Sequence, residues 1–394
     1  MAMAVTSPPD RSLRANLPAL LCLAAASCLA VSTEMLPVGL LPQIGAAFQI
    51  SDATAGLLVG LYAVMVATLA VPLTVLTIRF ARKPLLMVTV AGYAVSNAVV
   101  AVAPVFALVA AGRALGGITH ALFFSLVIGY APRLVPRALV GRALALAASG
   151  ASVGLVLGVP LLTSLGTAAG WRMSFVALTV LSVATLALLA KVLPPVGHDR
   201  TARPDRTEGD GRARLAAVAM SNMLVFLGQF TVYTFVSVML LAHGARPALI
   251  GPILLVCGAC GLLGLWYAGR GLDRNPRRTT AVLLGMTMLA VICLSVPSPG
   301  LWAVLVVVAV WCTAFGGVPS IYQSCAVRTG AMSPERAGAW INATSNAGIA
   351  GGSAIGAGLL GSAGLPALPW AGAALIGAAL AVALLSPKAF PSQA

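Results

Sequence analysis

The sequence predicts an all-α membrane protein of twelve transmembrane helices, arranged as two pseudo-symmetric six-helix halves. Three observations support this prediction: an apolar composition, a series of long apolar runs, and a one-sided distribution of basic residues. Of the 394 residues, 60% are hydrophobic and only 8% are charged, and the mean hydropathy is +1.00. Soluble proteins carry about 25% charged residues. The composition therefore excludes a soluble enzyme, a nucleic-acid-binding protein, a disordered chain and a disulfide scaffold.

Twelve apolar runs have the length of a membrane-crossing helix, which is about 20 residues. Backbone that faces lipid must satisfy its own hydrogen bonds, so we expect these runs to be helical. The expected spans are residues 17–41, 53–76, 84–103, 106–130, 143–166, 172–191, 215–241, 248–270, 279–297, 301–326, 338–362 and 366–386.

Basic residues fall on alternate loops of this arrangement. If the N-terminus is cytoplasmic, 21 of the 24 lysines and arginines lie on the cytoplasmic side, two lie outside, and Arg113 lies inside a span. This bias is the positive-inside signal of membrane proteins. It predicts a multi-pass protein of the cell membrane with both termini in the cytoplasm. It also explains the net charge of +15 without a nucleic-acid partner.

A polar segment at residues 191–214 separates the first six runs from the last six. The segment is rich in Arg, Asp, Pro and Gly and has no apolar period, so we expect a flexible cytoplasmic linker. Contact of its basic residues with anionic lipid is the alternative. The two halves are then residues 1–190 and 215–394, a layout typical of transporters built from parallel repeats.

The fifth run carries glycines at every fourth position, Gly150, Gly154 and Gly158, followed by Pro160. Glycines four apart share one helix face and allow a neighbouring backbone to approach closely. The proline removes a hydrogen bond and permits a kink. Generic helix packing is the alternative to a conformational role. A second stripe, in the eleventh run, consists of Gly348, Gly352 and Gly356.

Short basic turns occupy the same place in each half, directly after its second span. The first contains Arg79 and Arg82, and the second contains Asp273 and Arg274. These charges either orient the chain in the membrane or have a conformational role. Ile78 stands in the first turn where the second has Asp273, so the first turn lacks the Asp–Arg pair of the second.

These motifs resemble those of the major facilitator superfamily, and within it the drug:proton antiporters with twelve spans. The basic turns resemble its loop motif G-x-x-x-D-R-x-G-R-R, and the glycine run, followed by Gly170, Trp171 and Arg172, resembles its antiporter motif. Residues 33–42 and 113–120 resemble the chloramphenicol-resistance and arabinose- or sugar-efflux permeases. The resemblance implies glycine stripes at the contact between the halves, and export of a small molecule driven by the proton gradient.

Glu34 is the only acidic residue inside an expected span. A charged side chain at the bilayer centre costs about 2.5–3.5 kcal/mol on insertion scales, so such residues usually face the protein interior and have a function. Glu34 and Arg113 both fall roughly 10–12 Å below the outer edge. If their helices are neighbours, as the resembled fold implies, the two side chains pair.

We therefore expect Glu34 to carry the coupling proton, because burial favours its neutral form and a nearby Arg113 favours its charged form. A permanent structural pair is the alternative. His120 lies two turns deeper than Arg113 on the same helix face, so the three residues are expected to line one side of a central cavity. His120 then relays protons, forms a neutral wall of the substrate pocket, or simply packs.

The second half has no acid inside an expected span and offers neutral polar side chains instead. Such groups either orient a ligand or form hydrogen bonds between helices, worth about 0.6 kcal/mol on average. One acid and several amides favour a neutral or zwitterionic substrate over a polycation. The candidate substrate-binding residues of the whole chain are His120, Phe124, Asn222, Gln229, Tyr233, Tyr322, Gln323, Asn342 and Asn346.

Together these features predict a secondary active transporter that exports a small organic molecule, antibiotic-like or sugar-like, in exchange for protons. An uncoupled or importing metabolite carrier of the same fold is the alternative. The sequence has no phosphate-binding loop of an ATP-driven pump, and its seven cysteines are scattered in apolar runs. We expect no catalytic residues, no metal and no cofactor. The expected partners are the substrate, protons and the lipid bilayer, and the chain is expected to work as a monomer.

Overall fold

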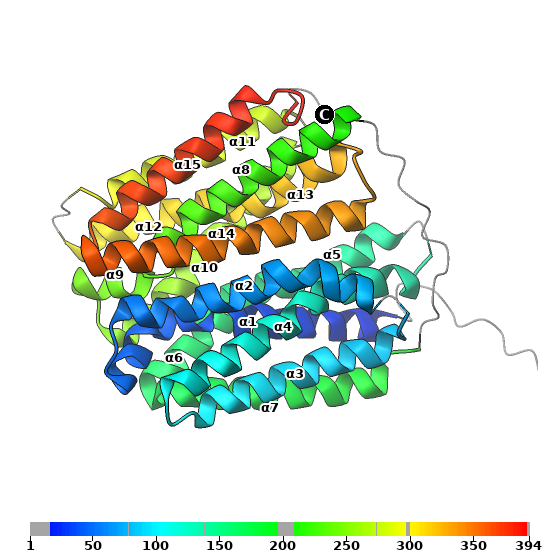
Figure 1. Cartoon of the computed structure of the whole chain (residues 1–394), viewed down its shortest axis with the longest axis horizontal. Coiled ribbons are helices and arrows are strands. Elements are labelled where there is room, and N and C mark those ends of the chain that lie inside the picture. The colour runs from blue at the N-terminus through cyan, green and yellow to red at the C-terminus, as the bar shows by residue number, and fades with distance from the viewer. Residues whose placement is uncertain are drawn as a thin grey trace, which may run out of the picture.

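Long helices that run in roughly one direction make up most of the structure (Figure 1). The computed structural model describes residues 16–77, 79–136, 139–195, 209–272, 274–296 and 300–391. Within these residues, ten helical segments are long and apolar enough to cross a membrane. Two more helices, α11 (Pro276–Cys293) and α14 (Pro334–Ser362), run alongside them. The arrangement is therefore consistent with the expected twelve spans.

The helices of the first half begin at Leu17. They are α1 (Leu17–Phe48), α2 (Asp52–Leu76), α3 (Arg82–Val102), α4 (Phe106–Tyr130) with the 3-10 turn η1 (Ala131–Leu134), α5 (Val140–Val153), the π-helical turn η3 (Gly154–Gly158), α6 (Val159–Ala169) and α7 (Trp171–Val192).

The helices of the second half begin at Gly209. They are α8 (Gly209–Tyr233), α9 (Val236–Ala242), the 3-10 turn η4 (Pro247–Leu249), α10 (Ile250–Leu272), α11, α12 (Leu301–Gly316), α13 (Val318–Arg328), α14 and α15 (Ala367–Leu385).

Three of the expected spans are interrupted helices. The fifth span contains the π-helical turn η3 between α5 and α6, directly before Pro160, and a proline lacks the N–H that would continue the regular ladder. The tenth span breaks at Gly317, and α13 begins at the next residue, Val318, with Pro319 in its first turn. The seventh span breaks between α8 and α9, at Thr234 and Phe235.

The largest differences from the predicted boundaries lie at the end of the first span and at the linker. α1 continues to Phe48 rather than ending at residue 41, although it contains Pro37 and Pro42. The expected linker is shorter than residues 191–214, because α7 continues to Val192 and α8 begins at Gly209. Residues 196–208 of that linker lie outside the described residues.

The two glycine stripes pack inside their own halves, and not between the halves as expected. Gly150 and Gly154 lie against the backbone of α1, where an added Cβ at Gly150 would meet the carbonyl oxygen of Ala24 at 1.8 Å. Gly352 of α14 likewise lies against the backbone of Leu227 in α8. The stripes allow close helix pairs within each bundle because only glycine leaves room for a second backbone there.

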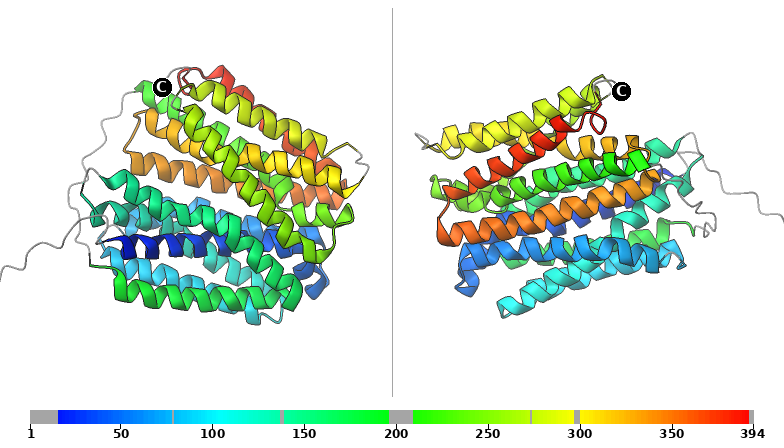
Figure 2. Two further views of the ribbon diagram at one scale, coloured as in Figure 1. Left: turned by 180° about the vertical axis from the view of Figure 1, so that it is seen from behind. Right: turned by 45° about the horizontal axis from the view of Figure 1, so that its top comes forward.

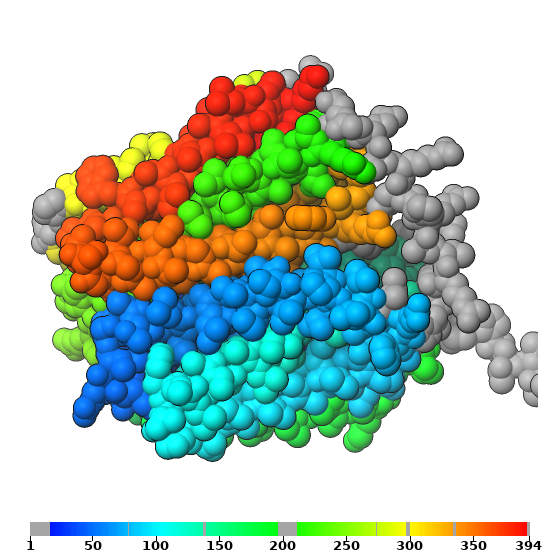
Figure 3. All heavy atoms as spheres, viewed as in Figure 1, coloured from blue at the N-terminus to red at the C-terminus, as the bar shows by residue number. Residues whose placement is uncertain are grey.

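The halves meet mainly along α2 and α14, whose side chains lie next to each other in the space-filling view (Figure 3). Further contacts join α6 and η3 to α10, which crosses toward them in the view from behind (Figure 2). The Ser237 hydroxyl of α9 also donates to the carbonyl of Val38 in α1 at 2.7 Å. These last contacts lie toward the end of the bundle opposite the Arg-rich turns, so the halves are held together at that end.

Candidate functional site

Glu34 lies near the middle of α1 and is only 8% exposed. The surrounding stretch of this helix, from Ser32 to Leu41, is buried on every side. α1 packs against α2, α4 and the fifth span in its own half, and against α9 in the other half. The fold therefore places the carboxyl group deep between helices and away from lipid.

Arg113 of α4 reaches α1 but binds its backbone. Its guanidinium donates to the main-chain carbonyls of Thr33 at 2.5 Å and Glu34 at 2.8 Å. Pro37, four residues after Thr33, has no N–H to offer the Thr33 carbonyl. A buried carbonyl without a partner is costly, so Arg113 supplies the donor that the proline removes.

The predicted pairing of the Glu34 and Arg113 side chains is therefore wrong for this structure. Instead, the imidazole of His120 faces the Glu34 carboxylate, with Nε2 3.7 Å from Oε2. The sequence places Arg113 and Glu34 at similar depth, but depth alone does not say which acceptor the guanidinium takes. Because Pro37 leaves the Thr33 carbonyl without a helical donor, the guanidinium binds the backbone.

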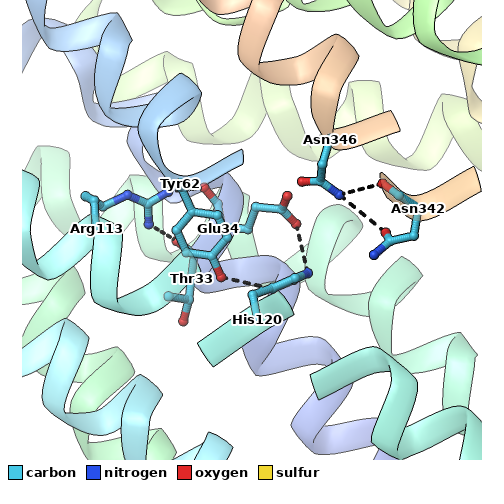
Figure 4. A network of polar contacts seen from close by, with 7 residues as sticks. All are labelled: Thr33, Glu34, Tyr62, Arg113, His120, Asn342 and Asn346. Atoms are coloured by element: carbon cyan, nitrogen blue, oxygen red, sulfur yellow. Dashed lines mark hydrogen bonds and ion pairs between the residues drawn. The ribbon is translucent and has the colours of Figure 1, made fainter. Parts of the chain in front are cut away.

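His120 is held on both ring nitrogens (Figure 4). Nε2 faces Glu34, and Nδ1 forms a 2.9 Å hydrogen bond with the hydroxyl of Tyr62. The rings of Tyr93 and Phe124 lie 6.2 Å and 5.1 Å from the imidazole. The predicted grouping of Glu34, Arg113 and His120 is confirmed as a neighbourhood, and Phe124 lies beside it.

Sequence reasoning missed the neutral members of this cluster. The ring of Tyr62 carries the Arg113 guanidinium 4.3 Å above its centre, a cation–π contact. Asn97 of α3 donates to the Thr33 hydroxyl at 3.1 Å. Each of these residues is a polar side chain inside an expected span, and that signal, applied to neutral as well as charged residues, would have found them.

Three buried polar atoms of the cluster have no hydrogen-bond partner among the described residues: the Tyr93 hydroxyl, Asn97 Oδ1 and Arg113 Nε. Buried polar groups are almost always hydrogen-bonded. The cluster therefore offers more hydrogen-bonding capacity than its own side chains use, as is typical of a site that works with water or a ligand.

Asn342 and Asn346 of α14 are residues of the second half that lie next to this cluster. Asn346 donates from Nδ2 to the backbone carbonyl of Asn342 at 3.0 Å and to its Oδ1 at 3.3 Å. That backbone bond fixes the orientation of the amide, and Asn346 Oδ1 is left buried without a partner. In Figure 4 the Asn346 side chain projects from α14 toward Glu34 and His120. The predicted shared face of Asn342 and Asn346 is confirmed.

Other candidates of the second half join its own helices. The two N–H groups of the Asn222 amide in α8 are shared among three acceptors of α14: the Ile341 carbonyl, Thr344 Oγ1 and Ser345 Oγ, at 2.9–3.1 Å from Nδ2. Trp311 Nε1 donates to Gln229 Oε1 at 2.7 Å. These two amides make the helix-to-helix bonds that were the alternative to ligand binding.

The tyrosines and Gln323 occupy different surroundings. The Tyr322 hydroxyl lies 2.7 Å from Ser221 Oγ, and its ring packs on Phe390 after α15, so it is fully buried inside the second half. Tyr233 packs edge-on against Trp311, and Gln323 is exposed. The structure thus brings Asn342 and Asn346 to the cluster, and not Tyr322.

The residues of the basic turns lie at or next to the ends of helices, outside this cluster. Arg79 lies in the turn between α2 and α3, and Arg82 is the first residue of α3. The Arg274 N–H donates to the Gly271 carbonyl at 3.1 Å. Asp273 lies outside the described residues, so the predicted conformational role of Asp273 and Arg274 stays a prediction.

Two helical bundles that cross a membrane, with a buried carboxyl and imidazole close to their contact, define the class of secondary membrane transporters. The family follows from the sequence: the chain belongs to the Major Facilitator Superfamily, whose family model matches residues 23–339.

The chain is also similar to curated transporters over nearly its full length. It is 32% identical over 375 residues to a chloramphenicol efflux pump of Mycobacterium tuberculosis, covering 91% of this chain and 89% of that protein. It is 27% identical over 353 residues to a probable sugar efflux transporter of Mannheimia succiniciproducens, covering 87% of each.

Solved structures share the fold at low sequence identity. A D-xylose–proton symporter superposes with a TM-score of 0.76 at 16% identity, covering 97% of this chain and 99% of that one. A bacterial homologue of the human lysosomal transporter Spinster, in an inward-facing and occupied conformation, gives 0.76 at 15% identity and 98% coverage of both chains. The chain is thus a multi-pass membrane transporter for a small molecule.

Proposed function

We propose that this chain is a secondary active efflux transporter of the cell membrane that exports a small organic molecule in exchange for protons. Glu34 binds the transported proton. The observation that supports this proposal is the identity of the side chain that faces the Glu34 carboxylate. Because Arg113 is hydrogen-bonded to main-chain carbonyls, the group that directly faces the buried Glu34 carboxylate is the imidazole of His120, while the charge of Arg113 acts on it without direct contact. A carboxyl group in that environment can change its charge without breaking the helix contact.

The proposed cycle couples charge to conformation. A proton from the outside neutralises Glu34 and favours the state open to the cytoplasm, and substrate binding from the inside then accompanies proton release. The contact that changes is the one between Glu34 and His120. Arg113 holds α1 against α4 in both protonation states, because the charge of its carbonyl acceptors does not depend on pH.

The proposed substrate is a neutral or zwitterionic molecule of the antibiotic-like or sugar-like kind that the names of the relatives indicate. His120 and Phe124 of the first half and Asn342 and Asn346 of the second are the proposed contacts. The proton gradient drives transport without a bound cofactor. The chain acts as a monomer, with both termini in the cytoplasm.

Proton exchange in everted membrane vesicles tests the proposal. Vesicles that hold the protein and a preformed inside-acid gradient receive antibiotics and sugars one at a time, while a pH-sensitive dye reports the gradient. Dissipation is expected with the wild type and is expected to be lost in Glu34→Gln. Asp52→Asn, the same chemical change at the first residue of α2, is the matched control and should behave as wild type.

The other outcomes are equally informative. Substrate uptake without any proton movement would show the uncoupled carrier that is the alternative function. Full coupling in Glu34→Gln would contradict the role of Glu34 while leaving proton exchange itself established.

A further inference from the structure

Tyr62 is a buried polar residue of the cluster that the proposed cycle does not use. It lies on α2, is fully buried, and its hydroxyl forms the 2.9 Å bond with His120 Nδ1. Its ring contacts the imidazole edge-on at 5.4 Å. Tyr62 is therefore the residue that contacts the ring nitrogen of His120 on the side away from Glu34.

The direction of this hydrogen bond follows from counting donors and acceptors. A phenol has one proton to donate. In the described structure the Tyr62 hydroxyl bonds His120 Nδ1 and also interacts with the Tyr93 hydroxyl, which acts as a donor to it without good hydrogen-bond geometry. If Nδ1 carried the proton, both neighbours would be donors and the Tyr62 hydroxyl proton would be left buried without an acceptor, which is costly. The Arg113 guanidinium over the ring face also draws electron density from the phenol and strengthens it as a donor. Tyr62 therefore donates and Nδ1 accepts.

The tautomer of His120 follows directly. A neutral imidazole that accepts at Nδ1 carries its proton on Nε2, and Nε2 faces Glu34 Oε2 at 3.7 Å. The proton on Nε2 thus points toward the carboxylate and stabilises its charged form. The other nitrogen of a histidine commonly sets its tautomer in this way.

We propose that Tyr62 is a positioning residue that holds His120 in the Nε2–H tautomer and thereby sets the pH at which Glu34 releases its proton. The link to Glu34 rests on the proposed function, whereas the tautomer does not. The other charged or titratable groups around His120 are Tyr93 from α3 and Arg113 from its own helix. α14 contributes neutral amides, Asn342 and Asn346.

The first experiment reads the tautomer without any transport. The full chain contains only three histidines, His120, His198 and His243, so nitrogen NMR of the ¹⁵N-histidine-labelled protein in lipid bilayers can resolve them, and His120→Gln assigns the signal. We expect a single Nε2–H tautomer in the wild type and a mixture in Tyr62→Phe. An Nδ1–H tautomer in the wild type, or an unchanged signal in Tyr62→Phe, would overturn the proposal.

Tyr93→Phe is the matched control. Tyr93 is also fully buried and also contacts the His120 ring edge-on, but its hydroxyl makes no bond to the imidazole and interacts only with the Tyr62 hydroxyl, without good hydrogen-bond geometry. The same loss of one hydroxyl should therefore leave the tautomer unchanged. A mixture of tautomers in both variants would mean that general loosening of the cluster, and not the Tyr62 bond, produces the effect.

The second experiment measures proton release on substrate addition as a function of pH. Without the Nε2–H donor fixed in place, Glu34 keeps its proton to higher pH, so the midpoint in Tyr62→Phe should move upward by about one pH unit. The maximal release should stay at the wild-type level. An unchanged midpoint beside a changed tautomer would refute the link to Glu34. Coupling that persists in Glu34→Gln would refute the proposed function and leave the tautomer result intact.

Discussion

The two halves of this transporter share a six-helix plan but bury different chemistry. The first half encloses Glu34, Arg113 and His120, whereas the described part of the second half buries no charged side chain and uses amides and hydroxyls instead. The second half therefore repeats the six-helix plan of the first half but not its buried charged side chains. We therefore propose that the first half carries the pH dependence of transport and that the second half contributes neutral hydrogen bonds to packing and to the substrate.

The largest effect on stability is expected from Arg113→Met, which leaves the buried Thr33 carbonyl without a donor and removes a second donor from the Glu34 carbonyl. The free energy of unfolding should fall by about 2–4 kcal/mol. In a Pro37→Ala background, residue 37 regains an N–H that can bond the Thr33 carbonyl, so the same substitution should cost about 1–2 kcal/mol less. Denaturant unfolding of the four proteins in detergent, followed by tryptophan fluorescence, measures the difference. Equal losses in the two backgrounds would refute the pairing of Arg113 with Pro37.

A comparison of two glycines in α5 is expected to give the next largest effect. Gly150→Ala places a Cβ 1.8 Å from the Ala24 carbonyl oxygen and should destabilise the first half by about 2–3 kcal/mol through overpacking. Gly141→Ala meets nothing within 4 Å and should stabilise the helix by about 0.5–1 kcal/mol. The same unfolding assay compares them. Similar effects at both positions would mean that the stripe does not hold α5 against α1.

Asn222→Ala tests the packing role of the second half. The substitution removes the amide hydrogen bonds between α8 and α14, so the free energy of unfolding should fall by about 1–2 kcal/mol. Because no charged group is involved, the pH midpoint of substrate-driven proton release should stay at the wild-type value. A shifted midpoint would show that the pH dependence is shared between the halves.

Asn346→Ala is expected to have the smallest effect on stability. Its Oδ1 has no partner in the described structure, so its loss is expected to matter chiefly for substrate binding. The KM for substrate should rise about 3- to 10-fold, the equivalent of one hydrogen bond, with an unchanged pH midpoint. Uptake kinetics over a range of substrate concentrations measure the change. An unaltered KM would remove Asn346 from the substrate site.

Much of the fold and part of the site could be predicted from the sequence. Apolar runs and basic loops report directly on the bilayer, and Glu34 and His120 stand out because polar groups are costly there. The partner of Arg113 could not be predicted, since it depends on which of several acceptors at one depth the guanidinium reaches.

The packing partners of the glycine stripes were predicted wrongly for a related reason. A run of small residues predicts a close helix contact, but it does not say whether Gly150 meets a helix of its own half or of the other one. Asn222 and Gln229 could not be separated from Asn346 either, because an amide that binds a ligand and an amide that bonds a neighbouring helix have the same sequence signal.

The bond between Arg113 and the carbonyl freed by Pro37 has a consequence for how this protein can change over generations. Loss of Pro37 alone restores a regular backbone bond for the Thr33 carbonyl, after which Arg113 can be replaced at a lower cost. Loss of Arg113 first leaves that buried carbonyl without a donor. The two replacements are therefore better tolerated in one order than in the other, so the missing N–H of Pro37 makes the history of this site directional.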